Sequence, residues 1–109
     1  MIANTATHGS YYAVIFTSEL TDNTADYEHT ADRMIELAAL QPGFLGVESA
    51  RSGLGITISY WKDEASIAAW RKNAEHTMAR ERGRTEWYKA FCTRVCKVER
   101  EYSFERKSD

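Results

Sequence analysis

Four side chains able to act on a small molecule stand close together in the middle of the chain, and we predict that they are catalytic: Tyr60, Trp70, Asn73 and His76. The last three are spaced by three residues, so on a helix each step turns by about −60° and they form a ridge that could border a cleft. A dry pocket lined by aromatic rings suits a flat apolar ligand. One base or amide in it suffices to deprotonate a phenolic substrate, which then becomes electron-rich enough to react with dioxygen.

The position of His76 on its helix leaves the role of this residue open. The apolar residues of the helix form one stripe, within an arc of about 80°, made up of Ile67, Trp70, Ala74 and Met78. On an unbroken helix His76 lies about 180° from Ile67 and points away from that stripe. This predicts a solvated or hydrogen-bonded surface histidine, with a role in a pocket and metal ligation as the alternatives.

Two further groups of candidate ligands have structural interpretations. Arg80, Arg82 and Arg84 alternate with acidic residues and glycine, which is typical of a solvated helix end. Cys92 and Cys96 would be about 13 Å apart on one strand, too far for a disulfide, and no nearby Cys or His completes a zinc site. We therefore predict buried free thiols and no metal site.

The candidate residues lie on a helix that follows a β-hairpin. Apolar segments at about 44–51 and 54–62 are typical of strands, and Ser52-Gly53 between them is a hairpin signal. Asp63 can cap the helix that comes next, and Gly83 is a plausible end to it.

A first strand at about 11–20 and a first helix precede the hairpin. Asn23 or Thr24 can cap this helix, and Gln41-Pro42-Gly43 ends it, because the residue before proline resists the α conformation. After the second helix we expect a short extra turn at 85–88 and a long final strand at about 89–104. The order is the ferredoxin-like β-α-β-β-α-β pattern, an α+β fold with an antiparallel four-stranded sheet.

The apolar positions of the final strand change phase. Phe91, Thr93 and Val95 are at odd positions, whereas apolar residues further on are at even ones: Cys96, Val98, Tyr102 and Phe104. A strand can change phase by inserting a residue, so we predict a β-bulge near Val95-Cys96. The resulting bend would let the second half of the strand reach the sheet of a partner.

The first strand predicts that the protein is a homodimer. Its segment Tyr11 to Phe16 is apolar at every position, so both of its faces need to be buried. Two helices can cover only one face of a small sheet. In a chain of 109 residues, a second copy is the obvious cover for the other face.

Composition narrows the class of protein. With 43% hydrophobic and 28% charged residues the chain is globular, and its length fits one domain at 11–109 after a flexible leader at 1–10. The net charge of −2, with both signs interspersed, argues against nucleic-acid binding. No apolar run is long enough for a membrane span and no signal sequence opens the chain, so we expect a cytoplasmic protein.

Several of these motifs, in this order, resemble the antibiotic biosynthesis monooxygenase (ABM) superfamily, in particular a poorly characterised bacterial branch. The similarity covers about Tyr11 to Phe104. It rests on Gln41-Pro42-Gly43-Phe44, Ile58-Ser59-Tyr60-Trp61, Ala69-Trp70, Glu75-His76, Gly83-Arg84, Trp87-Tyr88 and Val98-Glu99-Arg100 with Tyr102. The resemblance implies a dimeric α+β barrel, in which two ferredoxin-like units pack sheet against sheet with a pocket between each sheet and its helices.

The resemblance implies two activities, and a non-enzymatic role is the third hypothesis. The first is a monooxygenase without cofactor that oxidises a small aromatic or quinone-like molecule. The second is haem binding or degradation, in which His76 would ligate iron and Trp70 would press on the porphyrin; that branch has an asparagine at what corresponds to Ser18 here. The third is a dimeric ligand-binding or stress protein, which a closed interior without a cavity would favour.

Overall fold

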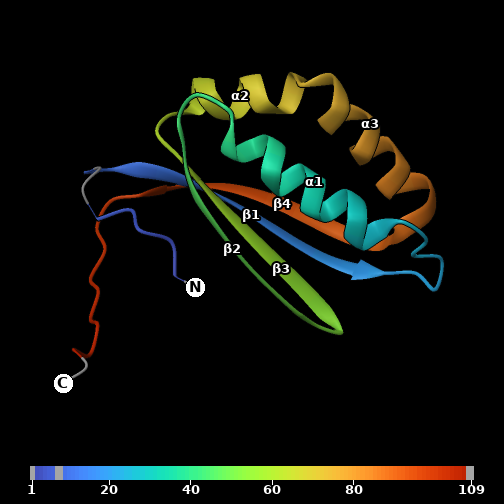
Figure 1. The fold of residues 1–109 in the computed structure, drawn as a ribbon, viewed down its shortest axis with the longest axis horizontal. Helices are drawn as coiled ribbons and strands as arrows, with labels where there is room; N and C mark the ends of the chain where they lie inside the picture. The colour runs from blue at the N-terminus through green and yellow to red at the C-terminus, as the bar shows by residue number, and fades with distance from the viewer. Residues whose placement is uncertain (1, 7–8, 108–109) are drawn as a thin grey trace.

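The protein folds as a four-stranded sheet with helices on one side (Figure 1), as seen in a computed structural model that describes residues 2–6 and 9–107. The helices and strands are β1 (Tyr11–Leu20), α1 (Tyr27–Ala39), β2 (Phe44–Ser52), β3 (Leu54–Trp61), α2 (Glu64–Lys72), α3 (Ala74–Arg82), the π-helical turn η1 (Gly83–Trp87) and β4 (Tyr88–Val98). None of the helices in the described part of the chain has the length and apolar character needed to cross a bilayer.

The sheet has the strand order β2-β3-β1-β4, and all neighbouring strands are antiparallel. This is the topology that the β-α-β-β-α-β order predicts, so the ferredoxin-like α+β fold is confirmed. The register places Val14 between Ser59 of β3 and Val95 of β4. Because side chains alternate along a strand, this register decides which residues share a face of the sheet.

The two faces of the sheet have different surroundings (Figure 1). The face beneath α1, α2 and α3, called the covered face below, carries Val14, Phe16, Val47, Thr57, Ser59, Trp61, Thr93 and Val95. The opposite face, called the open face, carries Tyr11, Ala13, Ile15, Ile56, Ile58, Tyr60, Cys92, Cys96 and Val98. Segments near the two termini lie against one end of the open face. Ala3 N donates to Glu48 Oε2 at 2.9 Å, and Thr5 Oγ1 donates to the Tyr11 hydroxyl at 2.9 Å.

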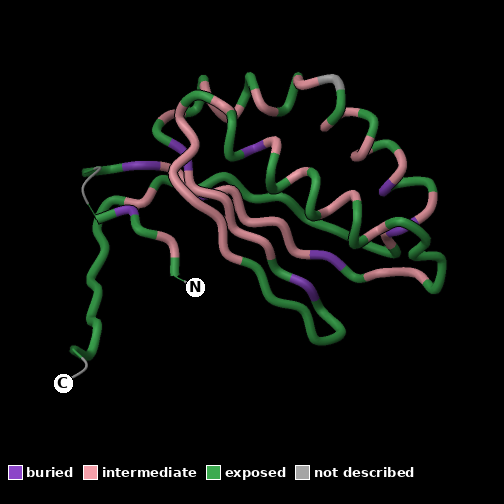
Figure 2. The backbone as a smooth tube through the Cα atoms, in the orientation of Figure 1, coloured by how far each residue is buried: buried purple, intermediate pink, exposed green. Residues whose placement is uncertain are grey.

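The few fully buried side chains lie where the elements meet rather than across the whole sheet (Figure 2). Trp61 at the end of β3 is completely buried, and its Nε1 donates to Ser59 Oγ at 2.9 Å. Trp87 is also buried, and its Nε1 donates to the carbonyl of Ala25, which anchors the approach to α1. Tyr11 and Ala13 are buried at the end of β1 that the terminal segments cover.

The start of α1 differs from the prediction. Neither Asn23 nor Thr24 caps it: the helix begins after Asp26, which has a φ of 63° and makes no capping hydrogen bond within the described residues. Contacts with distant residues hold this segment instead. Asp26 Oδ2 accepts from Arg82 at 3.2 Å, beside the Trp87–Ala25 hydrogen bond. The other two local predictions are confirmed: Asp63 accepts from Ser66 N at 2.8 Å and caps α2, and Gly53 has the positive φ of 82° that the hairpin turn needs.

The second predicted helix is broken at Asn73, and this corrects the expectation of a single apolar stripe. Asn73 has a φ of −56° and a ψ of 129°; it ends α2 and begins α3, and its Oδ1 accepts from His76 N at 3.1 Å. An asparagine stabilises a helix start in this way, so the break has a local cause. Met78, placed on the stripe by helical periodicity, is 72% exposed as a result. The α-helix ends at Arg82 with Gly83 as its C-cap, as predicted, and the π-helical turn η1 follows at the place of the predicted extra turn.

The final strand is regular where we predicted a bulge, and it ends earlier than predicted. Val95 and Cys96 pair with Val14 and Ala13 without a shift, and the register shift of this strand pair lies at Glu19/Leu20 instead. Both faces of β4 carry apolar residues, so the apparent change of phase was the sum of two regular patterns. The strand ends at Val98 while still paired with β1, and residues 99–107 form no strand. Cys92 and Cys96 are free, as predicted, but exposed in the single chain.

Candidate functional site

An apolar cavity of about 440 Å³, open to solvent on one side, lies between the helices and the covered face of the sheet. Ligand sites typically have volumes of about 300–1,000 Å³, so this cavity can hold a small ring system. Its floor is made of sheet side chains that include Val14, Phe16, Val47, Thr57, Ser59 and Val95. Its walls come from the helices and η1 and include Ala31, Met34, Ile67, Trp70, His76, Ala79 and Trp87.

Trp70 and His76 form the most ordered contact in this cavity. Their rings are stacked, with centroids 4.2 Å apart and an interplanar angle of 10°. The Nδ1 atom of His76 lies 3.0 Å from the carbonyl oxygen of Trp70. A carbonyl can only accept, so Nδ1 donates, and the lone pair of the neutral ring is on Nε2. His76 therefore has the tautomer that a general base needs.

The environment of His76 favours its neutral form. Burial lowers the pKa of this imidazole below its usual value, and the positive charges of Arg80 and Arg71 lower it further. The hydrogen bond to the Trp70 carbonyl acts in the opposite direction but does not reverse the shift. A base whose pKa lies below 6.5 is unprotonated, and so able to take a proton, over the whole neutral range.

The break at Asn73 is what brings His76 into the cavity. On a continuous helix His76 would have pointed away from Trp70, and we predicted a surface histidine for that reason. Asn73 ends one helix and caps the next, which changes the direction of the chain and brings the imidazole over the indole. Asn73 itself acts as a capping residue in this geometry. The indole also stacks on Trp61, with centroids 6.3 Å apart, so a fixed ring supports it from the sheet.

The structure does not bring Tyr60 together with the other three candidates. Tyr60 lies on the open face, where its hydroxyl donates to Glu48 Oε1 at 2.6 Å and its ring meets Tyr11 edge to face. Burial, and secondly the hydrogen bond to the Glu48 carboxylate, raise the pKa of the Tyr60 phenol. The sheet therefore separates this tyrosine from the cavity.

Among the lining residues of the cavity that were not predicted as site residues are Arg71, Arg80, Arg84 and Tyr88. A signal for two of the arginines was available, because His76, Arg80 and Arg84 are spaced by four residues and so share one side of the helical path. Only Arg82 of the supposed solvated cluster faces another way, toward Asp26 and Glu86. Tyr88 packs edge to face on Phe16 and Tyr27, and burial raises the pKa of its phenol.

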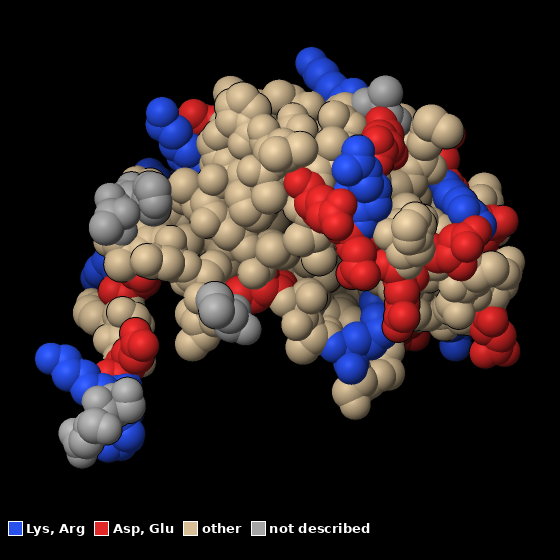
Figure 3. All heavy atoms as spheres, in the orientation of Figure 1, with Lys and Arg blue, Asp and Glu red and all other residues tan. Residues whose placement is uncertain are grey.

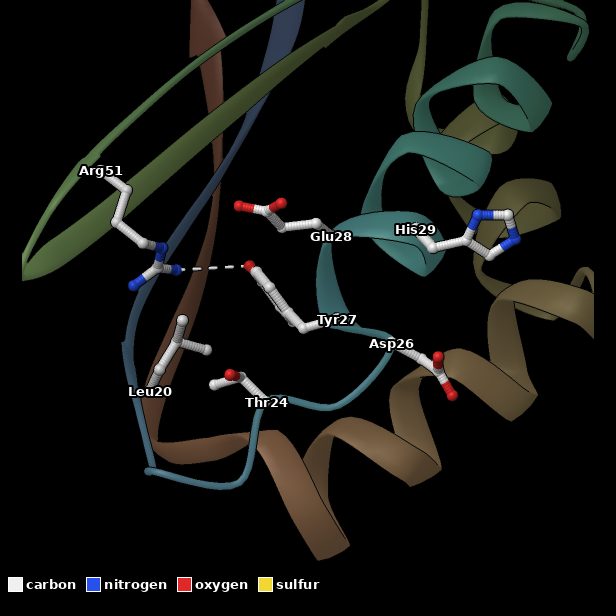
Figure 4. Close-up of a pocket in the computed structure, with 7 residues that line it drawn as sticks. All are labelled: Leu20, Thr24, Asp26, Tyr27, Glu28, His29 and Arg51. Carbon is white, nitrogen blue, oxygen red and sulfur yellow. Dashed lines mark hydrogen bonds between the residues drawn. The ribbon is translucent and has the colours of Figure 1, made fainter.

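A second pocket, of about 370 Å³, lies at the start of α1 (Figure 4). Arg51 reaches over it from β2 and donates to the Tyr27 hydroxyl at 3.4 Å and to Ser18 Oγ at 2.6 Å. Asp26 and His29 point to the other side of the helix start in Figure 4, away from Arg51. The polar groups of this pocket do not converge, and so we assign it no chemistry.

The donor set for a metal ion is also absent among residues 2–6 and 9–107. No group of three or more His, Cys, Asp or Glu side chains in this part of the chain is arranged to hold an ion.

Comparison with known proteins gives one clear family and several similar folds. A family model described as antibiotic biosynthesis monooxygenase matches residues 11–82. The uncharacterized protein YqjZ of Bacillus subtilis is 50% identical over 101 residues, which are 91% of this chain and 89% of YqjZ. A protein named jasmonate monooxygenase ABM, of Pyricularia oryzae, is 39% identical over 49 residues, 45% of this chain but only 23% of that longer protein. Among solved structures, SnoaB, described as a cofactor-independent oxygenase of Streptomyces nogalater, has a similar fold, with a TM-score of 0.65 at 14% identity over 90% of this chain and 99% of that one.

Proposed function

The chain belongs to the antibiotic biosynthesis monooxygenase family, and on that premise we propose that it is a cofactor-independent monooxygenase acting on a small aromatic or quinone-like substrate. One observation carries the proposal: a neutral imidazole with a free Nε2 is held against an indole in an apolar cavity. The cavity would exclude water from the substrate, and His76 would be the base.

The chemistry needs no electrons from outside the substrate. His76 Nε2 takes a proton from an activated ring CH₂ or phenol, and the resulting carbanion or phenolate gives electrons to dioxygen. A C–O bond forms to a peroxide, the O–O bond then breaks, and a ketone or quinone and one water leave. For a substrate R₂CH₂ the balance is R₂CH₂ + O₂ → R₂C=O + H₂O. Trp70, which stacks on both Trp61 and His76, would hold the imidazole in place at the cavity.

We further propose that the protein is a homodimer that buries the open face of the sheet. Ile56 is 39% exposed and both cysteines of β4 are exposed in the single chain, on a face that also carries Ala13, Ile15 and Ile58. A monomer seldom leaves such a surface in water. A second sheet packed on it would form the α+β barrel that the family resemblance implies. The cytoplasmic location remains a prediction from the sequence.

Oxygen consumption with a panel of anthrones and hydroquinones tests the proposed activity. We expect turnover by the wild-type protein and a loss of about 10²–10³-fold in kcat for His76→Gln, since a general base contributes about this much. His29→Gln is the matched control, because His29 is exposed on α1. Wild-type protein without activity on the whole panel, or a fully active His76→Gln variant, would overturn the proposal.

The two alternatives fit the geometry less well. In the haem-degrading branch an asparagine side chain stands where Ser18 stands here, and Ser18 is 2% exposed with its Oγ bound to Arg51. It is therefore not placed to orient a ligand on iron. A closed interior would favour the non-enzymatic dimeric ligand-binding or stress protein, whereas the cavity has room for a ring system. Titration with hemin, read as a Soret shift that His76→Ala abolishes, would restore the haem hypothesis.

A further inference from the structure

The charge of the cavity lining has only one sign. Three arginines line the cavity, Arg71, Arg80 and Arg84, and the described residues that line it include no aspartate, glutamate or lysine. The chain as a whole has 16 acidic and 14 basic residues and a net charge of −2. On the face seen in Figure 3, basic and acidic side chains lie among one another. The positive lining is therefore a local property of the cavity.

One hydrogen-bond donor of Arg80, its Nε, is unused among the described residues. Its Nη2 donates to the carbonyl oxygen of Arg71 at 3.1 Å and to Thr77 Oγ1 at 3.4 Å. Its Nε is buried and has no hydrogen-bond partner in the described part of the chain. A buried N–H group without a partner is unfavourable, more so on a charged group, so native structures usually provide a partner for it.

The arginines of the cavity are not neutralised by ion pairs, in contrast to Arg82 on the same helix. Arg82 is paired with Asp26 and Glu86, and Arg33 with Glu36 and Glu75. No ion pair among the described residues involves Arg71, Arg80 or Arg84. Burial, followed by repulsion from Arg71 and Arg84, lowers the pKa of Arg80, although a guanidinium stays charged in proteins. The fold thus places positive charge at the cavity, partly buried at Arg80 and exposed at Arg71 and Arg84, and pairs none of it with a carboxylate of the described residues.

We infer that the ligand of this cavity supplies the missing charge: it is an aromatic or alicyclic carboxylate whose carboxylate binds Arg80 and whose ring lies against Trp70 and His76. This inference rests on the proposed function for the identity of the site. A guanidinium donates two parallel hydrogen bonds to a carboxylate, which is its best-matched anion. Arg84 and Arg71 add charge at the same side of the cavity. Binding by arginine leaves His76 Nε2 free for the reacting carbon.

Calorimetric titration with two naphthalene derivatives of the same shape tests the inference. The probes are 1-naphthoate and 1-naphthamide, which differ in charge but hardly in size. We expect the wild-type protein to bind 1-naphthoate at least tenfold more tightly than 1-naphthamide, as expected when a single charged hydrogen bond is added (about 1.4 kcal/mol for tenfold). In Arg80→Gln the preference should fall below threefold. Arg100→Gln, an exposed arginine beyond the last strand, is the matched control and should keep it.

Two further variants keep the test decisive if Arg80→Gln does not fold. Arg84→Gln removes an exposed guanidinium and should weaken 1-naphthoate binding about threefold while leaving 1-naphthamide unchanged. Arg80→Lys keeps the charge but loses the planar pair of donors, and should retain only part of the preference. Equal binding of the two probes by the wild-type protein, or an undiminished preference in Arg84→Gln and Arg80→Lys, overturns the inference.

The binding assay separates the failure of this inference from the failure of the proposed activity, because it needs no dioxygen. A charge preference that depends on Arg80, in a protein that consumes no oxygen with any anthrone, supports the carboxylate site and refutes the monooxygenase. Turnover of neutral anthrones without any charge preference in binding supports the monooxygenase and refutes the carboxylate site. If both hold, an anthrone with a ring carboxylate should have at least a tenfold higher kcat/KM than anthrone itself.

Discussion

The polar side chains on the two sides of the sheet differ in whether they have hydrogen-bond partners. On the open face, tyrosine and glutamate are paired: Tyr60 donates to Glu48, and Tyr11 donates to Glu101 at 2.7 Å. Above the covered face, His76 and Arg80 of α3 line an empty volume; the Nε2 of His76 is free, and the buried Nε of Arg80 has no partner among the described residues. Polar groups that satisfy one another stabilise the fold, whereas groups that the described chain leaves unsatisfied beside a cavity indicate a ligand.

The largest expected effect concerns what covers the open face. Ile15→Arg places a charge on that face between Ile58 and Arg94, with no carboxylate opposite it, and burial of an unpaired charge costs several kcal/mol. We expect the dimer to dissociate, with a dissociation constant raised roughly 10³-fold or more. Sedimentation velocity measures it, with Met78→Arg as the control because Met78 is exposed on α3. A wild-type protein that is monomeric at micromolar concentration would contradict the assignment of this face to a partner.

The second effect contrasts the pH dependence of the two faces. His76 must be neutral to act, and because its pKa is lowered from 6.5, the rate should be level from about pH 8 down to about pH 6.5 and fall only at lower pH. Tyr60→Phe should leave the rate within about twofold and the profile unmoved, since Tyr60 lies on the other side of the sheet. A pH profile that shifts in the Tyr60→Phe variant would contradict the assignment of His76 as the base.

A smaller effect tests the break between α2 and α3. Asn73→Ala removes the side chain that accepts from His76 N and should lower the free energy of unfolding by about 1 kcal/mol, as the loss of a helix cap usually does. Thermal unfolding measures it, and Asn73→Asp, which can still accept, should retain most of the stability. Equal destabilisation by both variants would mean that capping is not the function of Asn73.

The smallest effect is an alkaline loss of stability from the open face. Burial and the Glu48 hydrogen bond raise the pKa of Tyr60 in the folded state, so the protonated phenol stabilises the fold fully below the unfolded pKa of about 10. That contribution is lost as the pH rises above about 10. Urea unfolding between pH 9 and 11 should show a steeper decline for wild-type protein than for Tyr60→Phe. If the stability of the two proteins declines in parallel with pH, ionisation of Tyr60 does not contribute to the alkaline loss of stability.

The elements could be predicted from the sequence because their signals are local. β1 spans 11–20 as predicted, the hairpin turns at Gly53, and Asp63 caps α2. The final strand was predicted too long because Tyr102 and Phe104 continued an alternation, although both are highly exposed beyond its end. An apolar pattern does not say whether a neighbouring strand is still present to pair with.

The candidate site was predicted in part, and its errors have separate causes. Trp70 and His76 were identified, but periodicity over an unbroken helix turned His76 outward. The alternation of charges predicted a solvated helix end, although Arg80 and Arg84 line the cavity. The signal at Asn73, an asparagine three residues before His76, is also common inside helices, so only the tertiary structure decides that it breaks this one. Tyr60 was grouped with the others because it is near them in the sequence. Side chains alternate between the two faces along a strand, and Tyr60 lies on the face away from the cavity.

The break at Asn73 places residues of the cavity on two separate helices, α2 and α3. Trp70 belongs to α2, whereas His76 and Arg80 belong to α3, and hydrogen bonds from His76 and Arg80 to the carbonyls of Trp70 and Arg71 fix the angle between the two helices. The angle at Asn73 therefore sets the distance from the indole to the guanidinium, and a different angle would alter the length of molecule that fits while the sheet stays as it is. Relatives could change which ring systems they accept by a single substitution at this break, without any change in the residues that perform the reaction.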